Sequence, residues 1–185
     1  VSVIARIDKQ KGFDLIKDTF EEMMNLDIQF VLLGQGEKEY HNFFTEMMKK
    51  YKNKVSINLT YDNELAHKIY AGSDMFLMPS HFEPCGLTQL ISLTYGTIPV
   101  ITPVGGLIDT VVKYDQDKDT GSGFVLDNYS KVSLIASLEQ AVSLYKNKKK
   151  WGKLIKRAMA SNFSWDKSAK EYIDIYKKAR AKKTD

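Results

Sequence analysis

The chain has 185 residues, of which 43% are hydrophobic and 27% charged, a composition typical of one globular domain with a full core. The formal net charge of +4 arises from 27 basic and 23 acidic residues. The excess lysines are spread over the C-terminal part of the chain, which argues against a nucleic-acid partner. One cysteine excludes an internal disulfide, and no apolar stretch has the length of a membrane span. We therefore expect a cytoplasmic protein with neither a nucleic-acid nor a membrane partner.

Strand-like apolar runs alternate with helical patterns along most of the chain. The predicted strands are Val1–Ile7, Gln29–Leu33, Val55–Leu59, Met75–Met78, Pro99–Thr102 and Gly123–Leu126. The predicted helices between them are Phe13–Met24, Lys38–Tyr51, Asn63–Ala71, Leu87–Tyr95 and Leu107–Val112. Asp62 is the expected N-cap of the third of these helices.

Three further helices are predicted after the last strand, at Lys131–Tyr145, Lys149–Ser161 and Trp165–Arg180. The alternation before them predicts an α/β fold with a doubly wound parallel sheet. We expect residues 1–185 to form a single Rossmann-like domain whose C-terminal helices occupy residues 131–182. In such a sheet, ligands bind at the carboxyl ends of the strands, so the loops that follow the strands are where functional residues are sought.

Two cations follow the first predicted strand. Arg6 and Lys11 are five residues apart, and Gly12 leads into the first helix. A guanidinium forks across two phosphate oxygens and an ammonium supplies a compact charge, so the pair suits a diphosphate whose negative charge grows as it departs. The alternative is that Arg6 pairs with an acid such as Asp8 and that Lys11 is merely solvated. The spacing alone does not decide between them.

The second and third loops carry weaker signals. After the second strand comes a Gly-x-Gly pattern formed by Gly34 and Gly36. An ordinary tight turn explains this pattern as well as a ligand site does. Tyr61 lies where the third strand gives way to a helix, a position from which an aromatic ring can stack on a base. The alternative for Tyr61 is a partly buried ring without a ligand.

The most informative segment is Pro79–Leu90, which reads PSHFEPCGLTQL. It places one carboxylate, Glu83, on a proline-bounded turn just before a glycine that opens an amphipathic helix. Backbone N–H groups at a helix start bind anions, and a carboxylate beside them accepts hydrogen bonds from hydroxyls, so a ligand with sugar and phosphate ends fits. The alternative is that Glu83 only stabilises the helix start. A nucleophilic Cys85 with His81 as base is disfavoured because Pro84 intervenes and no third group orients the base.

Paired glycines, Gly105 and Gly106, follow the fifth strand and precede a short amphipathic segment. They allow the main chain to approach a ligand, although turn chemistry also accounts for them. The acidic run Asp115–Asp119 lacks the glycine and the bidentate glutamate of a calcium loop. We predict no metal site.

Three of these segments resemble motifs of the bacterial glycogen synthase and plant starch synthase family, retaining glucosyltransferases of the GT-B fold. The Glu-Pro-Cys-Gly-Leu-Thr-Gln motif lies at 83–89, Arg-x-x-x-x-Lys-Gly at 6–12, and Gly-Gly-Leu-x-Asp-Thr-Val at 105–111. A related group of retaining transferases carries a second glutamate eight residues after the first, where this chain has Ile91. That departure favours the synthases.

The resemblance implies roles for individual residues. Arg6 and Lys11 bind the nucleotide diphosphate and Glu83 binds the glucose hydroxyls, which makes these three the expected catalytic residues. Tyr61, which precedes Glu83 by 22 positions, stacks on adenine. Residues that hold the sugar and the distal phosphate, or approach the nucleotide, are expected at Cys85, Gly86, Leu87, Thr88, Gly34, Gly105 and Gly106.

By the same resemblance, the chain is the C-terminal domain that binds ADP-glucose in a glycogen or starch synthase. The enzyme transfers glucose to the non-reducing end of an α-1,4-glucan with retention and without a metal or other cofactor. The acceptor-binding N-terminal domain, with its Lys-x-Gly-Gly loop, is absent from these residues, so the chain alone is expected to be inactive. A bacterial protein would be cytoplasmic and a plant protein plastidial. The alternatives are a UDP-sugar-dependent GT-B transferase or epimerase, and a non-catalytic nucleotide-binding module.

Overall fold

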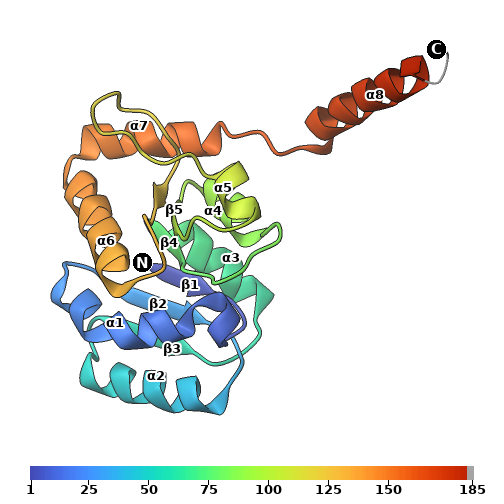
Figure 1. Ribbon diagram of the computed structural model, residues 1–185. Coiled ribbons are helices and arrows are strands. Elements are labelled where there is room, and N and C mark those ends of the chain that lie inside the picture. The colour runs from blue at the N-terminus through green and yellow to red at the C-terminus, as the bar shows by residue number, and fades with distance from the viewer. Residues whose placement is uncertain (183–185) are drawn as a thin grey trace.

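A computed structural model describes residues 1–182 of the chain. Its centre is one six-stranded sheet in the order β3-β2-β1-β4-β5-β6, in which every neighbouring pair is parallel (Figure 1). The strands are β1 (Ser2–Ile4), β2 (Phe30–Leu33), β3 (Val55–Asn58), β4 (Met75–Met78), β5 (Ile98–Ile101) and β6 (Phe124–Val125). The strand order reverses between β1 and β4, which confirms the predicted doubly wound α/β sheet.

The helices of the crossovers are α1 (Phe13–Asn25), α2 (Lys38–Lys50), α3 (Asn63–Gly72), α4 (Thr88–Tyr95) and α5 (Gly106–Thr110). Three more follow β6, namely α6 (Lys131–Lys146), α7 (Lys148–Met159) and α8 (Trp165–Lys182). Asp62 caps α3 as predicted, because its Oδ1 accepts a hydrogen bond from the Leu65 N–H at 2.9 Å.

Helices cover both faces of the sheet. On one face α1 packs beside α2 and α6, and on the other α3 packs beside α4 (Figure 1). Right-handed crossovers produce this division, because the chain moves one way along the sheet from β1 to β3 and the other way from β4 to β6. An aromatic cluster joins α1 and α2 to the sheet, with ring contacts among Phe13, Phe20, Phe30, Phe43 and Phe44.

The first strand is shorter than predicted. The sequence favoured a strand to Ile7, but β1 ends at Ile4 because the chain bends at Arg6, where the Asp8 N–H bonds the Arg6 carbonyl at 3.1 Å. Further along, Ile7 pairs with Gly36 in an isolated parallel bridge. The bend lifts Arg6 out of the sheet and places it on the loop. The fifth helix is also shorter than the predicted Leu107–Val112. β4 has the predicted bounds, and the remaining elements differ from prediction by one or two residues at one or both ends.

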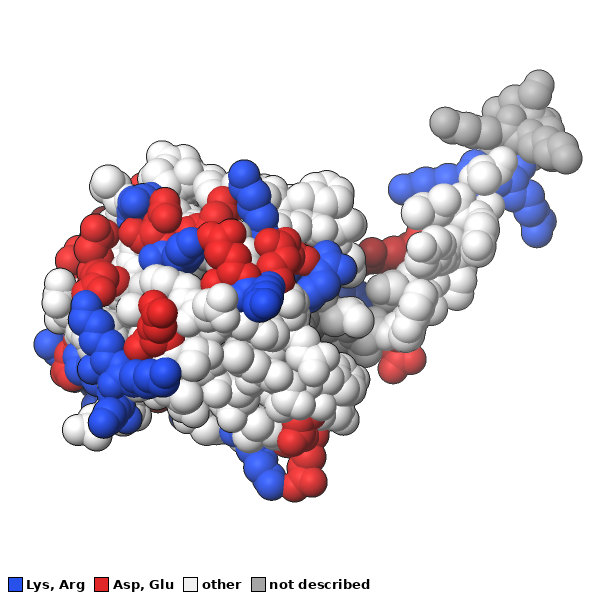
Figure 2. Space-filling model, turned by 90° about the horizontal axis from the view of Figure 1, so that it is seen from below, with Lys and Arg blue, Asp and Glu red and all other residues white. Residues whose placement is uncertain are grey.

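The last helix, α8, extends away from the rest of the molecule (Figure 1). Large apolar side chains on it are exposed, including Trp165, Tyr172 and Tyr176. Residues 183–185 of the predicted domain lie outside the described part of the chain. Acidic and basic side chains are intermixed on the underside of the body (Figure 2). Within residues 1–182, no helix combines the length and the apolar character needed to span a membrane.

Gly12 brings the start of α1 against the loop after β4. Its backbone is left-handed, with φ of 82°, and a Cβ built there would lie 1.9 Å from the Pro79 carbonyl oxygen. Only glycine allows this approach without strain. The segments that carry Lys11 and Glu83 are thereby held side by side.

We predict that Gly12→Ala lowers the free energy of unfolding by about 1–3 kcal/mol, because it combines a disfavoured backbone conformation with a steric conflict. Urea denaturation measures the change. The matched control is Gly152→Ala within α7, where nothing lies within 4 Å of the added Cβ. That substitution is expected to stabilise by about 0.5–1 kcal/mol. Equal effects of the two substitutions would contradict the close-packing argument.

Candidate functional site

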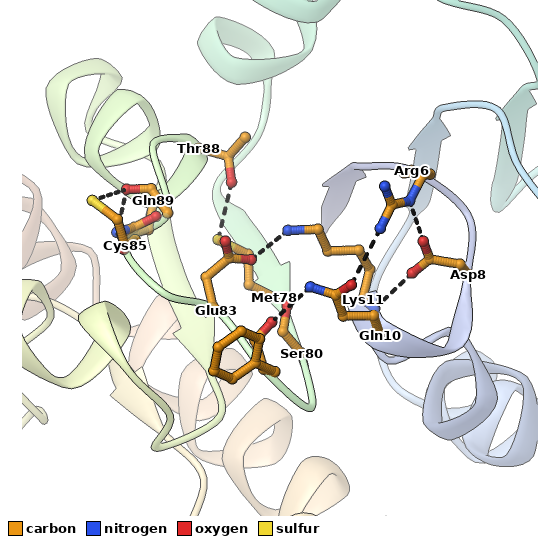
Figure 3. A network of polar contacts seen from close by, with 12 residues as sticks. Arg6, Asp8, Gln10, Lys11, Met78, Ser80, Glu83, Cys85, Thr88 and Gln89 are labelled. Atoms are coloured by element: carbon orange, nitrogen blue, oxygen red, sulfur yellow. Dashed lines mark hydrogen bonds and ion pairs between the residues drawn. The ribbon is translucent and has the colours of Figure 1, made fainter.

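The candidate site lies where the strand order reverses. After β1 the chain passes to α1 on one face of the sheet, and after β4 it passes to α4 on the other. The two loops therefore separate and leave a crevice at the carboxyl ends of these strands. The loop after β1 carries Arg6 and Lys11, and the loop after β4 carries Glu83 (Figure 3).

Two adjoining cavities occupy this crevice. The larger has a volume of about 650 Å³ and is lined by residues that include Arg6, Gly34, Tyr61 and Thr88. The smaller, of about 210 Å³, lies between β1 and β4 and is lined in part by Arg6, Lys11 and Thr88. Because Arg6 and Thr88 line both cavities, the two form one cleft that runs from Tyr61 to Lys11.

At the inner end of the cleft, Lys11 points across to Glu83, which is itself not among the described residues that line the two cavities (Figure 3). The Lys11 Nζ donates to Glu83 Oε2 at 2.5 Å, and the two side chains are 23% and 9% exposed. The predicted alternative of a merely solvated Lys11 is therefore wrong. Burial strengthens the attraction between the two charges relative to a pair in water.

Arg6 pairs with Asp8, the alternative that the sequence left open. Asp8 also caps the Lys9–Lys11 turn, since its Oδ1 accepts from the Lys11 N–H at 3.0 Å. A second contact joins the Arg6 Nη2 to Gln10 Oε1 at 3.3 Å. The Arg6 side chain nevertheless remains 63% exposed where the two cavities meet. Asp8 and Gln10 thus orient a guanidinium that is still accessible to an anion.

The outer end of the cleft is aromatic and glycine-lined. The Tyr61 ring is 84% exposed, so it is not the buried ring of the alternative interpretation. Gly34 lines the same cavity, and a Cβ there would lie 1.9 Å from the Ala5 carbonyl oxygen. Gly34 therefore allows the close approach of the main chain to Ala5 and also forms part of the cavity wall.

Comparison with protein-family models matches residues 1–158 to the family described as "Glycosyl transferases group 1". The chain belongs to this family. The match ends shortly before α8, the helix that extends from the body of the transferase domain.

Among curated relatives, the chain is 48% identical over 184 residues to a glycogen synthase from Thermosipho africanus and 46% identical over 177 residues to one from Bacillus cereus. These alignments cover 99% and 96% of the chain but only 38% and 37% of the relatives. Its structure is similar to the catalytic domain of starch synthase IV from Arabidopsis thaliana, bound to ADP and acarbose, with a TM-score of 0.86 and 37% identity. That match covers 96% of this chain and 37% of the other.

In this transferase domain, the paired glycines lie behind the Glu83 loop. The Gly106 N–H donates to the Glu83 carbonyl at 3.1 Å, and a Cβ on Gly105 would lie 2.0 Å from the same oxygen. Neither glycine is among the described residues that line the two cavities. The structure thus gives Gly105 and Gly106 a supporting position, and their ligand contacts remain predictions.

The rest of the motif loop joins Glu83 to α4. Thr88 is the first residue of α4 and lines both cavities, whereas Cys85, Gly86 and Leu87 are not among the described residues that line them. The predicted roles of these three residues therefore rest on the motif. Among residues 1–182, no group of three or more His, Cys, Asp or Glu side chains is arranged to hold a metal ion.

The structural role of Gln89 was not predicted, although the residue belongs to the motif at 83–89. Its side chain is fully buried, and its Nε2 donates to the carbonyls of Cys85 and Gly86, each at 3.0 Å. The same nitrogen lies 3.2 Å from Thr110 Oγ1 in α5. By taking up the carbonyl groups, Gln89 fixes the orientation of the peptide units between Glu83 and α4. A glutamine four positions after a cysteine does not indicate, in the sequence, that its side chain will bond backbone carbonyls.

We predict that Gln89→Leu lowers the free energy of unfolding by about 1–3 kcal/mol, because two carbonyl groups lose their donor inside the protein. The comparison variant Thr94→Val removes a hydroxyl that bonds the Leu90 carbonyl at 3.0 Å near the exposed end of the same helix. Water replaces that bond, so the variant is expected to change stability by less than about 0.5 kcal/mol. Similar losses in both variants would argue against a special role for Gln89.

Proposed function

We propose that this chain is the donor-binding domain of an ADP-glucose-dependent glycogen or starch synthase. One observation carries the proposal: a single cleft at the reversal of strand order has an exposed aromatic ring at one end, Arg6 in the middle, and at the other end Lys11, which is paired with the Glu83 carboxylate. That order matches the base, diphosphate and hexose of a nucleotide sugar. The similarity to glycogen synthases and to an ADP-bound starch synthase domain supports it.

In this proposal, Tyr61 stacks on the base while Arg6 and Lys11 bind the diphosphate. The bond from the anomeric carbon to the diphosphate oxygen breaks, and the negative charge that develops on ADP is stabilised by the two cations. Glu83 accepts hydrogen bonds from glucose hydroxyls and holds the ring in place. Retention follows if the acceptor hydroxyl attacks from the face that ADP leaves, without a nucleophile from the enzyme, and passes its proton to the departing diphosphate oxygen. The proposal assigns the contacts with the diphosphate to these two side chains and includes no metal.

The pairing of Lys11 with Glu83 gives the lysine a second task. A carboxylate next to a diphosphate would repel it, and this repulsion would be strong in a site from which water is partly excluded. Lys11 lies against the carboxylate at 2.5 Å and offsets its charge. The site can therefore present a hydroxyl-binding carboxylate close to a phosphate-binding cation.

The complete enzyme requires more than this chain. The chain spans under two fifths of the length of the glycogen synthases that it matches. We propose that the remaining part binds the α-1,4-glucan acceptor and closes the cleft, because glycosyl transfer requires both substrates in near-attack geometry away from water. A cytoplasmic location in a bacterium, or a plastidial one in a plant, is part of this proposal.

We predict that the chain binds ADP more tightly than UDP and that added salt weakens binding, because exposed cations contribute to it. Tyr61→Ala should weaken ADP binding by about tenfold, since stacking on a base contributes about 1–3 kcal/mol. Isothermal titration calorimetry measures both effects. Tyr61→Phe keeps the ring and should bind normally, and Tyr172→Ala on α8 serves as the distant control. Equal affinity for ADP and UDP would contradict the ADP-glucose assignment.

A second prediction concerns the full-length enzyme supplied with ADP-glucose and glycogen. Lys11→Ala should raise the barrier to transfer by about 2–4 kcal/mol, which lowers kcat more than it raises the KM for ADP-glucose. The matched control is Lys9→Ala, which removes an exposed cation from the same turn. Its rate should be close to that of the unaltered enzyme. If Lys11→Ala raised KM alone, the lysine would be a ground-state anchor only.

A further inference from the structure

A second polar cluster lies beside the candidate site, formed by His81, Asp14 and Tyr129. His81 follows β4, Asp14 is in the first turn of α1, and Tyr129 lies between β6 and α6. The His81 Nε2 is 2.9 Å from Asp14 Oδ2, and the Tyr129 hydroxyl donates to Asp14 Oδ1 at 2.6 Å. The rings of His81 and Tyr129 stack with centroids 3.8 Å apart. The two oxygens of the Asp14 carboxylate thus bind side chains from two different loops.

This cluster continues the contacts that hold the Glu83 loop. The His81 N–H donates to the Gln10 carbonyl at 2.9 Å, and the Gln10 Nε2 lies 3.5 Å from the Phe82 carbonyl. Glu83 follows and pairs with Lys11. Three successive residues are therefore held by the Lys9–Lys11 turn. The side chain of His81 adds a contact from this loop segment to α1.

The ionisation of the cluster suits this arrangement. Partial burial raises the pKa of Asp14, but the hydrogen bonds from Tyr129 and His81 outweigh it and hold that pKa below its usual value. Burial, and then the bond to Asp14, raise the pKa of Tyr129. Near neutral pH, an ionised acceptor thus faces a protonated phenol. Neutral imidazole donates through Nε2–H, and protonated imidazole donates with added charge attraction.

We propose that His81 is a positioning residue for the donor sugar, which acts through Asp14 and Tyr129 to fix the loop that carries Glu83. The proposal rests on the function proposed above. A loop held through His81 keeps the Glu83 carboxylate at the hexose end of the cleft. In the proposed function Glu83 binds glucose hydroxyls, which free ADP lacks, so the cluster should affect binding of the glucosyl group rather than of the nucleotide.

The test compares the affinities of the chain for ADP-glucose and for ADP by calorimetry. His81→Leu removes the donor and should weaken ADP-glucose binding by about tenfold, the size expected for one hydrogen bond to a charged group, while ADP binding stays within about twofold. His81→Gln is the rescue variant, because its Nε2 is as many bonds from Cβ as the imidazole Nε2. It should recover most of the lost affinity. Asp14→Asn should also weaken ADP-glucose binding selectively.

Asp119→Asn is the matched control for Asp14. Asp119 also accepts from a tyrosine hydroxyl, that of Tyr114 at 3.2 Å, but it pairs with Lys153 and Arg157 on α7. Asp119→Asn should leave the ratio of the ADP-glucose affinity to the ADP affinity unchanged. Equal losses for both ligands in His81→Leu, or no recovery in His81→Gln, would overturn the positioning role. If the unaltered chain bound neither ADP nor ADP-glucose, the proposed function itself would fail.

Discussion

The ion pair between Lys11 and Glu83 is the interaction on which the site depends. It joins the loop after β1 to the loop after β4, the two segments that the reversal of strand order drives apart. Two charges as little exposed as these require one another, because either alone would lose most of its solvation. The backbone contact of Gly12 with Pro79 brings the two loops within reach of this pair. A crevice that would otherwise be a gap between diverging chains thereby acquires a fixed width and a defined charge.

Close backbone packing supports the same region from behind. A side chain on Gly34, Gly105 or Gly106 would collide with a carbonyl oxygen of a neighbouring loop. Thr102 adds a hydrogen bond from its hydroxyl to the Ser80 carbonyl at 2.6 Å. The glycine contacts are made by main-chain atoms, and the hydroxyl of Thr102 belongs to a fully buried residue, so these loops pack closely through main chain and one short side chain. The glycines of such a motif belong to the construction of the site, whether or not they touch a ligand.

The sequence predicted the fold well because its information is periodic and local. Apolar runs and capping residues such as Asp62 mark elements independently of what packs on them. The bend that ends β1 at Ile4 was not predictable in this way, since it depends on contacts between the Arg6–Asp8 turn and the next loop. For the site, the sequence named Arg6, Lys11, Tyr61 and Glu83 and placed them on the correct loops. It did not pair Lys11 with Glu83, because residues 72 positions apart meet only in the folded chain.

Side-chain contacts that support the site, within the motif at 83–89 and outside it, were also not predictable from the sequence. Gln89, Asp14 and Tyr129 are ordinary residues in their own segments, and their roles come from buried or bridging geometry. Asp14 is an example: it lies in the first turn of α1, yet its two oxygens bind residues that lie 67 and 115 positions away along the chain. Helix electrostatics alone explains a carboxylate at a helix start. The sequence therefore gives no reason to expect that Asp14 also makes tertiary contacts. A residue whose local pattern already explains its presence gives no sign of its distant contact in the sequence, and here such residues support the loops that carry the Lys11–Glu83 pair at the inner end of the cleft.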